Sequence, residues 1–395
     1  MKDPEPAFGF FIDGKPVDDG ALSRALPIGL SDDAPKIAYA HYFQALAEAL
    51  RARNFEPIRR SLQVLTGESF LPDRIRDVRI DSVKHGALYH VAKVTVDVSG
   101  RSFSMAMNSA VHPKRQAALE REWTTLESLS KTATAPYVPR GLYLGEGLWH
   151  GASREASPFR FFLARWFDGF HEWHLEKGQG DRVETVRVWD GSAAGRELTD
   201  AESSQLMEQA AYILTLALDR QDFRHIHPWH HAAGDFVVTV EGPAVAVRLI
   251  AARNLRVLVP PGSEPHERLS AVAAFFFALT FRLRLDRDRG TGDLVWAPDR
   301  WLPAVARGFL RGWTDGAPPH EAFSTEDVRA ALGAFGASDW ETVGDLLADD
   351  LIVDPDEELL VTRLIPDHAR DLHRSLRWDD LSRSVAKQSV DVLNS

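Results

Sequence analysis

The sequence has 395 residues, 44% of them hydrophobic and 26% charged, a balance typical of a soluble globular protein with two or three domains. Its net charge of −11, without a long basic run, argues against a general nucleic-acid binder. Because the chain has no cysteine, disulfides, thiolate metal sites and cysteine nucleophiles are excluded.

Segments for export or membrane insertion are not expected. The first residues lack the apolar core of a signal peptide, and the most apolar run, Ala271–Leu279, is too short to cross a bilayer. We therefore expect a cytoplasmic protein with neither a membrane nor a nucleic acid as its partner. The composition leaves the partner open between a small molecule and another protein.

Residues 1–72 are expected to form an N-terminal extension that is helical in its second half. The residues up to Asp33 are rich in Pro, Gly and Asp, which is typical of irregular structure. From Pro35 to Leu65 apolar residues recur at spacings of three to four, which predicts a helix. A boundary is expected at Gly67–Pro72.

Residues 73–168 are predicted to form a lobe with the element order β-β-β-α-β-β. The alternation of Val94, Val96 and Val98 indicates a strand with one buried face. The predicted strands are Ile75–Val83, Leu88–Val98, Ser102–Asn108, Tyr137–Leu148 and Phe159–Trp166, and the predicted helix is Pro113–Lys131.

Residues 169–395 are predicted to form a mostly helical lobe. It begins with a polar insertion, Lys177–Leu198, which is not expected to contribute to the core. A helix over Thr199–Leu218, capped by Thr199 or Asp200, precedes a histidine-rich loop and a hairpin of Phe236–Val240 and Ala244–Ile250. Five further helices are predicted over Leu269–Leu285, Asp299–Trp313, Ser324–Phe335, Asp339–Ala348 and Asp356–Trp378. The charged loop Asp286–Asp293 is interpreted as a solvated turn.

The loop before the hairpin concentrates the residues that could carry chemistry. Its histidines are His225, His227, His230 and His231, and Asp235 follows them. Imidazoles and a carboxylate are the ligands of zinc and related transition metals, so His225, His227, His230 and Asp235 are one candidate metal set. The alternative is that these imidazoles only form hydrogen bonds within the loop.

The order of the elements resembles the protein-kinase-like superfamily, nearest to its aminoglycoside and choline phosphotransferase branch. The resemblance implies an α+β fold with two lobes, the N-terminal one a small antiparallel sheet and the C-terminal one mostly helical. It implies that Gly86 lies in the turn over the nucleotide phosphates and that Glu122 is the helix glutamate. The strand Ser102–Asn108 lacks the lysine that pairs with this glutamate, and Lys93 is the candidate substitute.

In the same family a catalytic aspartate and a metal-binding asparagine precede the hairpin. His230 falls on the first of these positions and Asp235 on the second. The second metal ligand, an aspartate in an Asp-Phe-Gly-like sequence, falls on Ala251, which cannot bind magnesium. The resemblance therefore implies a pseudokinase-like protein, with binding or regulation as its function and standard kinase catalysis lost.

Two enzymatic alternatives stay open. In one, the loop from His225 to His231 with Asp235 serves the same cleft as a transition-metal or general-base site. In the other, a minor one, His230, His231 and Asp235 resemble the His-His-x-x-x-Asp sequence of acyltransferases, whose second histidine is the base. The catalytic candidates are thus His230, His231 and Asp235, and the cofactor is open between a nucleotide and a divalent transition metal.

Overall fold

The computed structural model describes residues 6–26, 37–85, 89–150, 156–178, 183–192, 194–228, 231–318 and 323–376. The chain divides into two compact units. Unit 1 comprises Met1–Lys131 and Pro139–Asp168, and unit 2 comprises Thr132–Val138 and Gly169–Ser395. Residues 1–72, expected as an extension, belong to unit 1.

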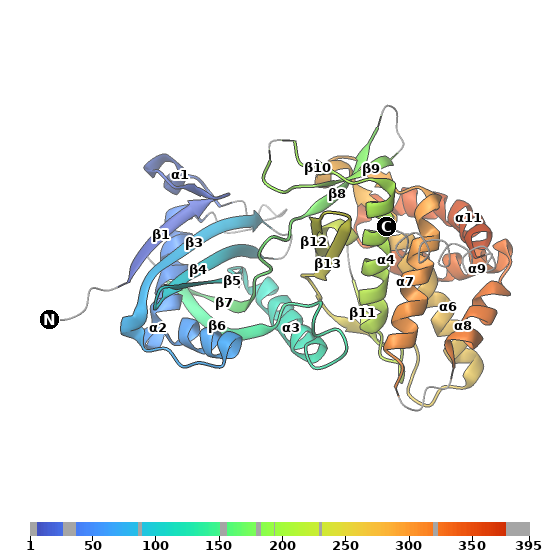
Figure 1. The fold of residues 1–395 in the computed structure, drawn as a ribbon, viewed down its shortest axis with the longest axis horizontal. Coiled ribbons are helices and arrows are strands. Elements are labelled where there is room, and N and C mark those ends of the chain that lie inside the picture. The colour runs from blue at the N-terminus through green and yellow to red at the C-terminus, as the bar shows by residue number, and fades with distance from the viewer. Residues whose placement is uncertain are drawn as a thin grey trace. The chain divides into compact units, whose positions relative to one another are not determined.

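Unit 1 is built on a seven-stranded sheet with the strand order β2-β1-β3-β4-β5-β7-β6 (Figure 1). Its strands are β1 (Ala7–Ile12), β2 (Lys15–Pro16), β3 (Ile75–His85), β4 (His90–Val98), β5 (Arg101–Ala110), β6 (Gly141–His150) and β7 (Ala156–Arg165). Its helices are α1 (Asp19–Ser23), α2 (Tyr39–Thr66), α3 (Pro113–Leu129) and the 3₁₀ turn Pro72–Arg74. The predicted order β-β-β-α-β-β is confirmed for β3 to β7.

The two long helices cover opposite faces of this sheet. Val94 and Val96 on β4 are completely buried in the same core cluster as Leu46 and Leu50 of α2. On the other face, the ring of Trp123 on α3 lies 5.8 Å from the ring of Phe162 on β7. Successive residues of a strand point to opposite faces of the sheet. Each strand can therefore pack alternate residues against α2 and against α3.

Residues 7–23, for which composition predicts irregular structure, form β1, β2 and α1. Strand β1 adds to the sheet edge, parallel to β3, with Phe10 paired opposite Ile80. The prediction was wrong because a six-residue strand whose partner lies some 70 residues away leaves only a weak local pattern. The helix predicted next is present as α2, but residues 53–55 in its middle have φ values of 50°, 60° and 62°.

Unit 2 combines short strands with most of the helices. Its strands are β8 (Trp173–Lys177), β9 (Val183–Val188), β10 (Arg196–Glu197), β11 (His225–Ile226), β12 (Phe236–Glu241), β13 (Ala244–Leu249), β14 (Leu255–Arg256), β15 (Leu285–Arg287) and β16 (Leu294–Trp296). Its helices are α4 (Asp200–Leu216), α5 (Ala232–Asp235), α6 (Pro265–Arg282), α7 (Leu302–Asp315), α8 (Thr325–Gly333), α9 (Ala337–Leu346), α10 (Ala348–Leu351) and α11 (Glu358–Ser375), with 3₁₀ turns at Asp288–Gly290, Asp299–Trp301 and Pro355–Glu357.

The polar insertion is part of the core, contrary to the prediction. Strands β8, β9 and β10 form a sheet in which Val186 and Val188 of this insertion are buried. The charged loop after α6 is also not solvated throughout. Asp286 is only 2% exposed and accepts the Leu175 N–H at 2.8 Å, while Asp288 accepts the Lys177 N–H at 3.0 Å. These carboxylates accept the backbone N–H groups on the edge of β8 that does not pair with β9. The sequence of the loop alone does not show that these N–H groups are nearby.

Local signals predicted the helix that precedes the histidine loop. Thr199 caps α4, because its side chain accepts the Glu202 N–H at 3.2 Å and Glu202 in turn accepts the Thr199 N–H at 2.8 Å. Helix α7 lies beside α4 (Figure 1) and approaches it closely. A Cβ atom added to Gly308 on α7 would lie 2.0 Å from the Glu208 carbonyl oxygen of α4.

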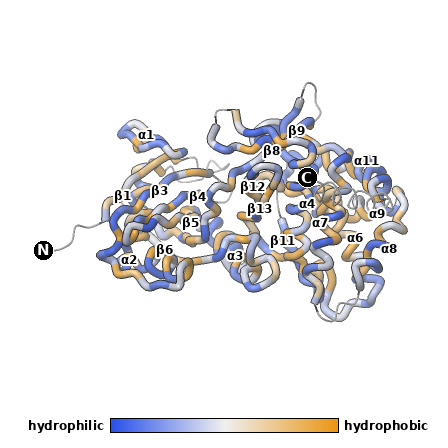
Figure 2. Tube along the Cα trace, viewed as in Figure 1, coloured by the Kyte–Doolittle hydropathy of each residue, from blue (hydrophilic) through white to orange (hydrophobic). Residues whose placement is uncertain are grey.

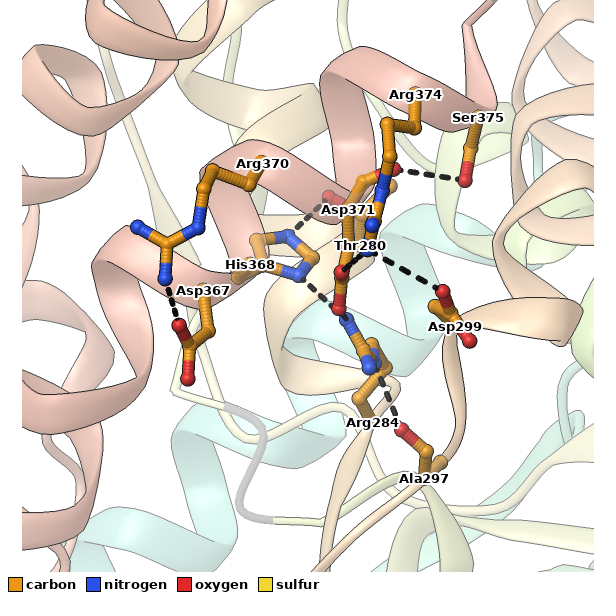
Figure 3. Close-up of polar contacts among 10 residues, drawn as sticks. All are labelled: Thr280, Arg284, Ala297, Asp299, Asp367, His368, Arg370, Asp371, Arg374 and Ser375. Carbon is orange, nitrogen blue, oxygen red and sulfur yellow. Dashed lines mark hydrogen bonds and ion pairs between the residues drawn. The ribbon is translucent and has the colours of Figure 1, made fainter.

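A buried imidazole joins helix α11 to the rest of unit 2 (Figure 3). Arg284 donates to Nδ1 of His368 at 3.2 Å and to Asp371 at 3.1 Å. Since Nδ1 accepts, Nε2 carries the proton that is shared with Thr280 at 3.0 Å. Complete burial and the neighbouring Arg284 charge lower the pKa of His368 well below its usual value, so this imidazole is neutral.

The fold class is α+β, as the sequence predicts, with a sheet-rich N-terminal unit and a helical C-terminal unit. Hydrophobic and hydrophilic residues are mixed along the helices (Figure 2). Within the described parts of the chain, no helix has the length and apolar character that a bilayer span needs.

Candidate functional site

Backbone hydrogen bonds place the histidine loop beside the segment that follows the hairpin. Strand β11 pairs with β14, and the His227 N–H donates to the Asn254 carbonyl at 3.0 Å. At the other end of the loop, the Ile250 N–H donates to the Asp235 carbonyl at 2.8 Å. The two segments that the family resemblance assigns to metal binding, Asp235 and residues 251–253, therefore lie side by side.

Asp235 is completely buried and both of its carboxylate oxygens are bound by one guanidinium. Arg253 donates from Nη1 to Oδ2 at 2.7 Å and from Nη2 to Oδ1 at 2.6 Å. Such paired, parallel bonds are the strongest form of an arginine–carboxylate contact. The Asp235 side chain thus already has a cationic partner where the family resemblance implies a metal ion.

His231, at the start of α5, is oriented by a distant carboxylate. Its Nε2 donates to Glu357 at 3.0 Å, and Arg282 donates to the other oxygen of Glu357 at 2.8 Å. Burial raises the pKa of Glu357, but the His231 hydrogen bond, the Arg282 charge and the Val353 N–H outweigh it and lower the pKa to about 2. Glu357 is therefore ionised and accepts only, so Nε2 of His231 is the donor in their hydrogen bond.

His225 and His227 lie together, with ring centroids 5.8 Å apart. They line a small cavity of about 30 Å³ with Arg256, Asp350 and apolar residues of α6 and α10. Burial lowers the pKa of His225 to about 4, against the raising effect of its bond to the Phe223 carbonyl. Burial and the Arg256 charge also lower the pKa of His227. Both rings are neutral at pH 7, and the cavity is wide enough for one or two waters.

The candidate metal set is only partly visible. His230 lies outside the described residues, while Asp235 is bound to Arg253 and His225 contacts the Phe223 carbonyl at 3.3 Å. Among the residues that the structure describes, no group of three or more His, Asp and Glu side chains is placed to hold a metal ion. The metal role of this set stays a prediction.

The nucleotide-binding candidates belong to unit 1. Lys93 pairs with Asp168 at 2.9 Å and lies 5.1 Å from the centre of the Trp166 ring. Glu122 is 2% exposed on α3, and Gly86 lies outside the described residues. Met107, on the strand that lacks the family's lysine, is completely buried. A nucleotide role for Gly86, Lys93 and Glu122 stays a prediction.

Sequence reasoning did not identify the partners that decide the chemistry of the loop. Glu357 lies 126 residues after His231, and no local pattern connects them. Arg253 lies 18 residues after Asp235. The only indication of it in the sequence is its position after Ala251 and Ala252, where the family has the glycine of Asp-Phe-Gly. An arginine that replaces the glycine of an Asp-Phe-Gly-like sequence can be recognised, but its contact with Asp235 cannot.

The chain was compared with family models, curated proteins and solved structures. No protein-family model matches the chain, and no curated protein matches its sequence. Among solved structures, the chain is similar to Rad53 1-466 in complex with AMP-PNP, with 13% sequence identity and a TM-score of 0.32. The match covers 64% of this chain and 60% of that chain.

Proposed function

We propose that this protein is a cytoplasmic, pseudokinase-like binding or regulatory protein that does not transfer phosphate. The observation that carries the proposal is the Arg253 guanidinium on both oxygens of Asp235. Phosphoryl transfer needs carboxylate or amide oxygens that hold Mg²⁺ against the nucleotide phosphates. Here one candidate ligand is bound by a guanidinium, and the other position is Ala251, which offers no ligand atom.

The energetics support the same conclusion. To bind a metal ion, Asp235 would have to release Arg253 inside a site where its carboxylate is completely buried. Breaking a buried ion pair costs about 3–5 kcal/mol. That cost would weaken metal affinity by a factor of about 10² to 4 × 10³. Magnesium at ordinary concentrations would then leave this carboxylate unoccupied.

The test combines binding and turnover on the full chain. Thermal unfolding is followed with ATP or ADP, each with and without Mg²⁺ and Mn²⁺, and ADP release is measured in parallel. We expect no metal-dependent rise in Tm and no turnover above the blank. Metal-dependent ADP release that is lost in Asp235→Asn would contradict the proposal.

A gain-of-binding variant sharpens the test. Ala251→Asp with Arg253→Gly places an aspartate and a glycine where the family has them, and it frees Asp235. We expect this double variant to bind Mg²⁺ more tightly than the wild type does, because two carboxylates then face one cation. Arg253→Gly alone is the matched control, since it frees Asp235 without adding a ligand.

A second candidate function is general-base catalysis by His231. It is favoured by the hydrogen bond to Glu357, because an imidazole oriented by a buried carboxylate is the arrangement of a base and its positioning group. His231 is also the second histidine, and hence the base, in the minor acyltransferase alternative. Hydrolysis of p-nitrophenyl acetate is the probe, and a rate that is unchanged in His231→Gln would reject this function.

A further inference from the structure

The start of the second half of α2 concentrates positive charge in an acidic protein. Residues 51–60, RARNFEPIRR, contain four arginines and one glutamate, whereas the whole chain has a net charge of −11. Three of these arginines, Arg53, Arg59 and Arg60, line one hollow of about 380 Å³ in unit 1. A volume of this order is within the range of small-molecule sites.

The arginines are held in different ways. Arg59 is fixed, because it donates from Nε to the Phe70 carbonyl at 3.1 Å and from Nη1 to the Asn54 carbonyl at 3.5 Å. Five N–H groups belong to a guanidinium, so these two bonds leave Arg59 further donors. Because its side chain is bonded to two backbone carbonyls, Arg59 is the fixed arginine of the hollow.

Arg53 and Arg60 share a single carboxylate. Glu56 pairs with Arg60 at 2.8 Å and with Arg53 at 3.5 Å, and the two arginine side chains are 65% and 80% exposed. Exposed pairs of this kind contribute little to stability and exchange readily with solvent ions. Three guanidinium groups against one carboxylate leave the hollow with a net charge of +2.

The helix itself adds to this potential. The left-handed residues 53–55 interrupt α2, so that a new helical segment begins at Glu56, with Pro57 in its first turn. The positive end of that segment's dipole therefore lies among the same arginines. Gln63, one turn beyond Arg59 and Arg60, and Phe70 also line the hollow.

We propose that this hollow binds a phosphate group of a small anionic ligand. A guanidinium can bind a phosphate through two parallel hydrogen bonds, and a phosphate offers three arginines more acceptor oxygens than a carboxylate does. Glu56 is the competing anion that the ligand displaces. The proposal is independent of Asp235 and of the loop in unit 2, so it goes beyond the proposed function.

The experiment is calorimetric titration of the full chain with inorganic pyrophosphate at constant ionic strength. We expect the double variant Arg53→Ala, Arg60→Ala to bind about tenfold or more weakly than the wild type. We expect Glu56→Gln to bind about threefold more tightly, because it removes the competing carboxylate and keeps the arginines. The matched control is Arg370→Ala, Arg374→Ala on α11, which removes the same charge from side chains that are 58% and 65% exposed.

Sedimentation with vesicles distinguishes the source of the phosphate. Phosphatidylcholine vesicles with and without phosphatidic acid are compared for the wild type and the Arg53→Ala, Arg60→Ala variant. Binding to phosphatidic acid that this variant loses assigns the hollow to a lipid phosphate, and pyrophosphate binding alone assigns it to a soluble one. The proposal is overturned if neither probe binds, or if the α11 control weakens binding as much as the α2 variant does.

Discussion

Arg253 and Asp235 form the contact with the largest consequence for a single side chain. Asp235 is completely buried and Arg253 is the cation bound to both of its oxygens. Removing one partner of such a pair leaves a buried charge that nothing compensates. The pair therefore contributes to the stability of unit 2 as well as to the loss of a metal site.

We expect Arg253→Ala to lower the free energy of unfolding by about 3 kcal/mol or more. The measurement is urea unfolding at pH 7. Adding Asp235→Asn should recover part of that loss, because the buried charge is then gone. The matched control is Arg370→Ala, whose pair with Asp367 is exposed, and we expect it to cost less than about 1 kcal/mol. Equal losses in the two arginine variants would contradict this account of Asp235.

The close contact between helices α4 and α7 depends on two glycines of α7. Gly308 and Gly312 are spaced by four on α7, so both lie on the face that meets α4. A Cβ atom at Gly312 would lie 2.8 Å from the Tyr212 carbonyl oxygen, in addition to the closer approach at Gly308. Beside this contact, Arg307 and Arg311, also spaced by four on α7, both pair with Glu208 of α4.

We expect Gly308→Ala to destabilise the protein by about 1–3 kcal/mol, because the methyl group must push the two backbones apart. The measurement is the midpoint of thermal unfolding together with urea unfolding. Gly234→Ala is the control, since a Cβ atom at Gly234 would meet nothing within 4 Å. A loss at Gly308 no larger than that at Gly234 would show that the helices separate without cost.

Elements with a local signal were predictable, and those with a distant partner were not. The hairpin of β12 and β13 and the Thr199 cap of α4 follow from residues within a few positions of each other. Strand β1 and the sheet of β8, β9 and β10 were missed, because their burial depends on segments far along the chain. Likewise, the sequence predicts that Asp286 and Asp288 are solvated. In the structure they accept hydrogen bonds from N–H groups of β8 that lie 111 residues earlier in the chain.

The whole molecule contains buried groups that make it sensitive to acid. Burial lowers the pKa of His225 to about 4, and burial with the Arg284 charge lowers that of His368. Each imidazole takes up its proton at a higher pH in the unfolded chain, near 6.5, than in the folded one. The stability that they contribute is therefore complete above pH 6.5 and is lost as the pH falls from there towards 4.

Below pH 4 the protonation of a carboxylate lowers the stability further. The pKa of Glu357 is lowered to about 2, because hydrogen bonds and the Arg282 charge outweigh its burial. The stability that this carboxylate contributes is present above pH 4.5 and declines as the pH falls towards 2. Acid unfolding should therefore begin with the histidines and end with Glu357.

We expect the free energy of unfolding to fall by about 3 kcal/mol between pH 6.5 and pH 4 on account of His225. The measurement is urea unfolding across this pH range. His225→Gln removes the titrating group and should make the pH dependence shallower, whatever its effect at pH 7. The control is His150→Gln, because the His150 side chain is exposed. A slope that is the same in His225→Gln and in the wild type would contradict the assignment.

The sequence alone determined the fold class, the order of the elements from β3 to β7 and the loop in which the candidate residues gather. These features are local, because strand alternation, helix periodicity and capping act between residues a few positions apart. Only the tertiary structure decided which groups those residues meet. Arg253 meets Asp235 and Glu357 meets His231 through packing of distant segments, and these contacts decide whether a charge is a ligand or a structural partner.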